Sequence, residues 1–110
     1  MLKKLILIFK GFFPVKLKTY FKKFKKFNGY DGLDKRMLNY INYKNGFYID
    51  CGANDGINQS NTWYFEKKLG WKGLLIEPVD TVFYELQKNR SNRNFFFKTA
   101  LRSFDYKKKM

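Results

Sequence analysis

Histidine is absent from the sequence, and cysteine occurs once, as Cys51. A single cysteine excludes a disulfide within the chain, which fits a reducing compartment, and we expect a cytoplasmic protein. With no histidine and one cysteine, the sequence also argues against a zinc site and against a histidine general base. We therefore expect no metal site in this chain.

Long apolar runs are absent as well. No stretch approaches the roughly 20 apolar residues that a membrane-spanning helix needs. The opening letters, MLKKLILIFKGFFP, resemble a signal peptide only faintly, because Lys10 interrupts the apolar run and no small-residue cleavage site follows. We therefore do not interpret them as a signal peptide. At 110 residues, we expect one domain at most.

Acidic residues are missing from residues 1–30, which carry nine lysines and so supply +9 of the formal net charge of +14. Large apolar side chains recur there at helical spacing, which predicts a basic amphipathic helical arm. Either the apolar side of this arm packs on the domain, or the arm lies on an anionic membrane surface. Binding to nucleic acid is the less favoured interpretation, because no defined nucleic-acid motif accompanies the lysines.

A strand–turn–helix–strand pattern occupies residues 47–78 and is the centre of the remaining chain. It opens with FYIDCGANDG, whose first three residues have the composition of a buried strand. Gly52 and Gly56 follow, and glycine allows a turn to pass close to a ligand. A helix over residues 60–69 and a second strand over residues 73–76 complete half of a mononucleotide-binding βαβ unit.

The charges around this turn indicate which ligand it would take. Two carboxylates, Asp50 and Asp55, flank the turn, and its spacing is G-x-N-x-G rather than G-x-G-x-x-G. A pyrophosphate is disfavoured beside carboxylates, whereas a ligand with an ammonium and a sulfonium group suits them. S-adenosylmethionine is such a ligand. Glu77, at the end of the second strand, then fits a pair of ribose hydroxyls, because a carboxylate accepts two hydrogen bonds side by side.

Four motifs in order, IDCGANDGINQSNT, GWKGLLIEP, FYELQKNR and TAL, resemble those of the FkbM-type methyltransferases. The resemblance covers residues 31–101. It implies an S-adenosylmethionine-dependent O-methyltransferase acting on a hydroxyl of a sugar or glycoside. The family's proteins run to more than twice this length, and their later acidic motif has no counterpart here.

The resemblance and the turn chemistry together predict a set of cofactor-binding residues. Asn61 and Thr62 match the family's Ser-Asn-Thr and are expected at the amino-acid end of the cofactor, and Ala100 lies in the segment that passes under the adenine. The full predicted set is Asp50, Cys51, Gly52, Ala53, Asn54, Asp55, Gly56, Asn61, Thr62, Glu77, Pro78 and Ala100. The catalytic residues are unknown, because the family's substrate-binding segment and general base are expected beyond Met110.

The fold that follows is α/β: a partial Rossmann-like, class I methyltransferase fold preceded by the basic arm. We expect parallel strands near residues 47–50, 73–76 and 94–98 in the order 3-2-1, within a domain of residues 31–110 that is truncated after its third strand. The first strand's outer edge is then unpaired, although Phe47 and Ile49 suit burial on both faces. We expect such a chain alone to lack turnover. The alternative is a non-enzymatic basic module that binds a membrane or a polyanion, with a remnant nucleotide-binding half-fold.

Local signals add expectations about the helices. Arg90 matches an arginine of the family, and the sequence leaves open whether it faces solvent or has a structural or substrate-binding role. Helices are expected over residues 33–42, 60–69 and 81–88, with the respective N-cap candidates Asp31 or Asp34, Ser60, and Asp80.

Overall fold

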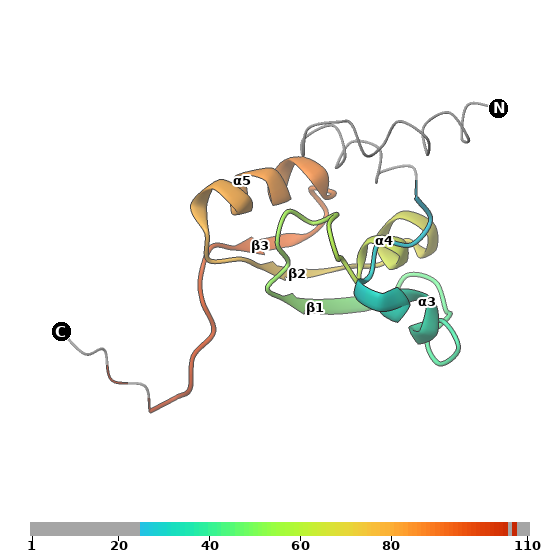
Figure 1. The fold of residues 1–110 in the computed structure, drawn as a ribbon, viewed down its shortest axis with the longest axis horizontal. Coiled ribbons are helices and arrows are strands. Elements are labelled where there is room, and N and C mark those ends of the chain that lie inside the picture. Colours follow the sequence, from blue (N-terminus) through green and yellow to red (C-terminus); the bar gives the residue numbers. More distant parts are fainter. Residues whose placement is uncertain (1–24, 106, 108–110) are drawn as a thin grey trace.

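Three parallel strands form one open sheet in the computed structural model, which describes residues 25–105 and residue 107 (Figure 1). The strands are β1 (Phe47–Cys51), β2 (Lys72–Ile76) and β3 (Phe95–Phe97). They lie in the order β1-β2-β3, with Leu75 opposite both Asp50 and Phe96. The α/β class, the parallel sheet and the strand order are therefore confirmed, since 3-2-1 is the same order read from the other edge.

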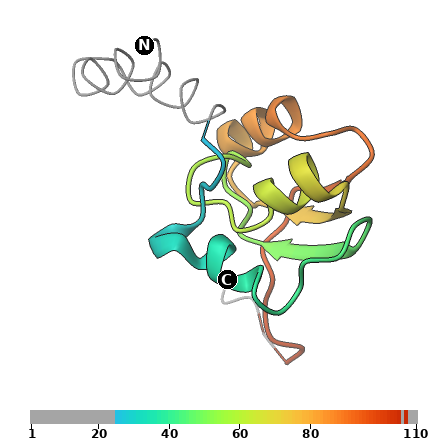
Figure 2. The same cartoon turned by 90° about the vertical axis from the view of Figure 1, so that its right-hand side faces the viewer.

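Two helices connect the strands and lie together on one side of the sheet (Figure 2). These are α4 (Trp63–Leu69) and α5 (Asp80–Asn89). Helix α4 ends at Gly70, whose φ of 69° is a left-handed conformation that glycine adopts without strain. The expected helix start at residue 60 was wrong by three residues, because a loop continues to Thr62. Asp80 is also not an N-cap: it is the first helical residue of α5, and Val79 occupies the cap position.

The core lies between the sheet and these two helices. Its buried members come from both layers: Tyr48 and Leu75 from the strands, Phe65 from α4 and Leu86 from α5, with Trp71 just before β2. Phe65 and Trp71 meet edge to face, with 5.1 Å between ring centroids. This burial is the main stabilising contribution, at about 1.5–3 kcal/mol per large apolar side chain.

The opposite face of the sheet is apolar and exposed. Phe47, Ile49, Phe95 and Phe97 retain 51%, 63%, 54% and 48% of their accessible surface. Alternate side chains of a strand point to opposite faces, and the helices that follow β1 and β2 both pack on the face of Tyr48. The expectation that Phe47 and Ile49 are buried was therefore wrong. In the part of the chain that the structure describes, β1 pairs only with β2, so its outer edge carries no strand.

A short helical segment precedes the sheet: the 3-10 turn η2 (Tyr30–Gly32) and helix α3 (Leu33–Met37). Helix α3 is shorter than the expected 33–42. Gly32 is its N-cap, so the two proposed aspartate caps were wrong. Asp34 is instead fully buried inside the helix, where its carboxylate accepts hydrogen bonds from the backbone amides of Asn28, Gly29 and Lys35, each at 2.9 Å.

Residues 25–32 pack against the β1–α4 connection and α4. Phe27 stacks on Tyr64 of α4 with 4.7 Å between ring centroids, and Gly29 forms a parallel bridge to Gln59. A methyl group at Gly29 would lie 2.5 Å from the Asp34 carboxylate, so this close approach requires glycine. Most of the predicted arm, residues 1–24, lies outside the described residues. No helix in residues 25–105 has the length and apolar composition needed to cross a membrane.

Candidate functional site

A cavity of about 150 Å³ lies at the carboxyl end of β1. Ligands of open parallel sheets bind at this end, because the connecting loops gather there. The cavity is walled by the turn that leaves β1 and by the loop that leads into α4. Its lining residues are Asp50, Cys51, Gly52, Ala53, Asn54, Asn58, Gln59, Ser60 and Asn61.

The turn owes its shape to three residues with positive φ: Gly52 (76°), Asn54 (55°) and Gly56 (83°). Glycine and asparagine tolerate this conformation better than other residues. The backbone amides of Gly52 and Ala53 each donate to the carbonyl of Ile76 at 2.9 Å, which ties the turn to the end of β2. The G-x-N-x-G spacing in the sequence therefore corresponds to a tight turn that forms the floor of the cavity.

Asp50 is the only charged group among the lining residues. Its Oδ2 accepts a hydrogen bond from the Thr62 hydroxyl at 2.6 Å. Asn61 also lines the cavity, and its side-chain Oδ1 is buried without a hydrogen-bond partner among the described residues. A buried acceptor without a partner costs about 1–3 kcal/mol. The residues that line the cavity thus include one carboxylate and no basic side chain.

Asp55 and Glu77 hold the turn in place. One oxygen of Asp55 accepts the amides of Ile57 and Asn58, at 2.9 and 2.8 Å. Glu77 is 7% exposed, and its carboxylate accepts hydrogen bonds from the backbone amides of Asn54 at 2.9 Å and of Val79 at 3.2 Å. Neither acid lines the cavity, although each Glu77 oxygen keeps a second lone pair.

The cavity contains six of the twelve residues predicted to bind the cofactor and omits the other six. The included residues are Asp50, Cys51, Gly52, Ala53, Asn54 and Asn61; the omitted ones are Asp55, Gly56, Thr62, Glu77, Pro78 and Ala100. Gly56 and Thr62 are buried beneath the loop, whereas Pro78 and Ala100 are exposed elsewhere.

Three lining residues, Asn58, Gln59 and Ser60, were missed as site residues. Gln59 has a φ of 57°, and only its polar neighbours hint at a loop there. Ser60 was expected at a helix N-terminus, and its Oγ does accept the amide of Trp63, the first residue of α4, at 3.1 Å. Thr62 nevertheless occupies the N-cap position. The run N-Q-S-N-T was the available signal, because polar residues between two apolar elements indicate a loop.

A buried polar network lies directly under the loop, and little in the sequence indicates it. Its centre is the pair formed by Arg90, whose side chain is 0% exposed, and Glu66, with 3.1 Å between Arg90 Nε and Glu66 Oε1. Tyr48 and Asn94 complete it: the Tyr48 hydroxyl lies 2.9 Å from Glu66 Oε1 and 2.6 Å from Asn94 Oδ1. The Asn94 side chain also donates to Glu66. The sequence left open whether Arg90 faces solvent. The structure shows that it does not, because Arg90 is buried in this network.

The network shifts the titration of two of its members. Burial raises the pKa of Tyr48 well above its usual value, and its hydroxyl therefore stays protonated. Burial alone would raise the pKa of Glu66. The Arg90 charge, with hydrogen bonds from Asn94, Ser91 and Tyr48, outweighs that effect and lowers the Glu66 pKa below its usual value. Glu66 and Arg90 are therefore a charged pair at neutral pH.

Comparisons of the chain with protein-family models, with curated proteins and with solved structures each find no match. Within residues 25–105, no three histidine, cysteine, aspartate or glutamate side chains are grouped as a metal ion would require.

Proposed function

We propose that this chain forms the S-adenosylmethionine-binding part of a methyltransferase that resembles the FkbM type and methylates a hydroxyl of a sugar or glycoside. A cavity at the carboxyl end of β1, built from a glycine-containing turn, supports this proposal. The parallel sheet and its two connecting helices support it further, because this arrangement is compatible with half of a nucleotide-binding fold.

The observation that carries the proposal is the charge of the cavity. Asp50 is the one charged residue among those that line the cavity, and no lining residue is basic. An ammonium group would be attracted to the Asp50 carboxylate, whereas a phosphate would be repelled by it. A pyrophosphate-bearing dinucleotide is therefore the poorer ligand for this turn.

The residues present fit one end of S-adenosylmethionine. A cavity of about 150 Å³ is smaller than the roughly 300–1,000 Å³ of sites that enclose a drug-sized ligand, so we assign it to the amino-acid end. Asp50 would hold the ammonium. The ribose would lie beyond the cavity, toward the end of β2, where Glu77 retains acceptor capacity.

The cofactor would supply a methyl group on a positively charged sulfur. In the displacement at this methyl group, a sugar oxygen would form a bond to the methyl carbon, the sulfur would keep the electron pair of the broken carbon–sulfur bond, and the hydroxyl proton would pass to a base. Close positioning of the nucleophile is the main requirement of such a displacement. We assign no base among the described residues.

Isothermal calorimetry with S-adenosylmethionine tests the proposal. We expect binding in the micromolar to millimolar range, about 4–8 kcal/mol. Asp50→Asn keeps the size of the side chain and removes its charge, and should weaken binding by about 1.5–3 kcal/mol. Asp80→Asn is the matched control, because the Asp80 side chain is 79% exposed and its carboxylate pairs with the exposed Lys98 at 2.7 Å. Equal losses in the two variants would refute the role of Asp50.

A second candidate function rests on the composition of residues 1–30, which hold nine lysines and no acidic residue. In this proposal the chain is a basic module that docks on an anionic membrane or another polyanion. Lys25 and Lys26 are the first described residues of that segment, and both are exposed. Lys26 Nζ lies over the Phe27 ring, 5.4 Å from its centroid. The two functions are compatible, because one uses the arm and the other uses the turn.

A further inference from the structure

Arg90 lies outside the cavity, at the carboxyl end of α5, and yet it contacts the loop that walls the cavity. It comes after the whole strand–turn–helix–strand pattern in sequence. Arg90 is 4% exposed, and its guanidinium is buried between α4, β1 and the loop that connects them. A buried guanidinium is costly unless its charge and all of its donors are satisfied.

All five N–H donors of Arg90 have acceptors. Nε donates to Glu66 at 3.1 Å, and one donor reaches the Tyr48 hydroxyl at 2.8 Å. The other three reach the β1–α4 connection: the Gly56 carbonyl at 3.3 Å, Ser60 Oγ at 3.3 Å and Thr62 Oγ1 at 3.1 Å. Lysine has only three donors on one nitrogen, so it cannot make this set of contacts.

The contact with Thr62 continues into the cavity. A hydroxyl has one proton, and Arg90 donates to the Thr62 oxygen, so the Thr62 proton is directed to its other neighbour, Asp50, at 2.6 Å. Asp50 Oδ2 is thereby held, and the carboxylate faces the cavity in one orientation. Hydrogen bonds in such a chain strengthen one another, and here the chain begins at a full positive charge.

We propose that Arg90 is a positioning residue of the candidate site, which orients the Asp50 carboxylate through the Thr62 hydroxyl and fixes the cavity-lining loop through Gly56 and Ser60. The proposal rests on the proposed function, because it assigns Arg90 to the binding of the same ligand. It also explains why Thr62 is absent from the cavity lining: Thr62 acts on the ligand through Asp50.

Removing the relay hydroxyl without changing its volume tests this role. Thr62→Val replaces the hydroxyl by a methyl group, Thr62→Ser keeps the hydroxyl, and Thr81→Val makes the same change as the first on an exposed residue of α5. Each variant is titrated with S-adenosylmethionine at 10 °C, after circular dichroism has shown that it is folded. We expect a tenfold or greater loss of affinity for Thr62→Val, less than a threefold loss for Thr62→Ser, and no change for Thr81→Val.

The outcomes separate this proposal from the proposed function. If Thr62→Val binds as tightly as the parent chain, the positioning role is wrong and the proposed function stands. If the parent chain does not bind S-adenosylmethionine, both are wrong. Should Thr62→Val not fold, Arg90→Lys replaces it, since it keeps the charge beside Glu66 and loses donors to the loop. A folded Arg90→Lys with parental affinity would overturn the positioning role, and a loss of at least threefold would support it.

Discussion

Replacing Glu66 by glutamine removes the one negative charge that pairs with Arg90 in the part of the chain that the structure describes. The two side chains are 5% and 0% exposed, so neither charge is screened by water. Glutamine keeps the length of the side chain and one acceptor oxygen, so the packing of α4 is little changed. Glu66→Gln is therefore a test of charge pairing rather than of volume.

The expected cost is large because the perturbation leaves a buried guanidinium unpaired. Breaking one partner of a buried ion pair typically costs about 3–5 kcal/mol. The free energy of unfolding of a domain is about 5–15 kcal/mol, so for most domains a loss of this size removes a third or more of the stability. We expect the midpoint of urea unfolding to fall by more than 1 M, since the slope for a small protein is about 1–3 kcal/mol per molar urea.

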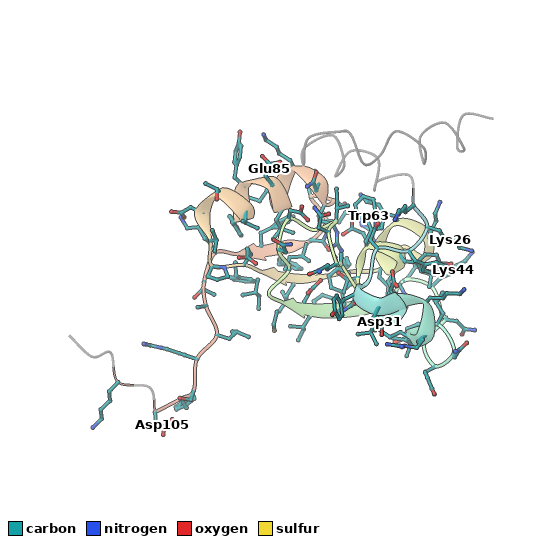
Figure 3. All side chains as sticks on the ribbon, viewed as in Figure 1. Lys26, Asp31, Lys44, Trp63, Glu85 and Asp105 are labelled. Carbon is teal, nitrogen blue, oxygen red and sulfur yellow. The ribbon has the colours of Figure 1, made fainter. Side chains whose placement is uncertain are left out.

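Fluorescence of Trp63 and Trp71, both buried, follows the unfolding transition. Glu85→Gln is the matched control: Glu85 projects from the outer side of α5 and pairs with Lys88 at 3.8 Å, with both side chains about half exposed (Figure 3). That pair should contribute at most about 0.5 kcal/mol. In the double variant Glu66→Gln/Arg90→Gln, we expect a smaller loss than the sum of the single losses, because no buried charge is left alone. A cost below about 1 kcal/mol for Glu66→Gln would refute the reasoning.

The same pair predicts the sign of a pH dependence. The Glu66 pKa is lowered in the folded chain from its usual 4.5. Its ionised form therefore contributes stability at pH values above 4.5, and this contribution is lost as the pH falls through the folded pKa. The parent chain should lose stability on acidification below pH 4.5 more steeply than Glu66→Gln does, as measured by urea titrations from pH 7 to pH 3.

Two further predictions concern the ligand and the arm. Glu77→Ala should weaken S-adenosylmethionine binding by about 1.5–3 kcal/mol through loss of a charged ribose acceptor; unchanged affinity in calorimetry would remove Glu77 from the site. Residues 1–30, with nine lysines, should give binding to vesicles of anionic lipid that weakens steeply with salt, because the screening length is only about 8 Å at physiological ionic strength; flotation that ignores lipid charge and salt would contradict the membrane interpretation.

The sheet was predictable from sequence because its signals are local. Aromatic and β-branched residues at 47–49 and phenylalanines at 95–97 indicate strands, and the intervening helical spacing indicates crossovers. The exposure of Phe47 and Ile49 was not predictable in the same way. Their composition is typical of a strand with helices packed on both faces of its sheet. Which face the helices actually cover depends on the handedness of the two crossover connections.

The turn of the candidate site was predictable from the sequence, but the buried polar network that supports the turn was not. Gly52 and Gly56 indicated a close-approach turn, and both have positive φ. The network under that turn joins Tyr48, Glu66 and Arg90, which are 18 and 24 residues apart along the chain. In the sequence, a glutamate in a helix and an arginine just after the end of one are typical of solvated surface residues. Only the packing of α4 and α5 on the sheet brings them together and buries them.

The central claim is that the turn after β1 receives a cationic nucleoside ligand without phosphates. Parallel calorimetric titrations of the 110-residue chain with S-adenosylmethionine and with NAD⁺ test it most directly, because the two ligands share an adenosine and differ in the ammonium-bearing and pyrophosphate-bearing parts. The account predicts saturable heat with S-adenosylmethionine and none with NAD⁺. Binding of NAD⁺ at equal or higher affinity, or no binding of S-adenosylmethionine, would contradict it.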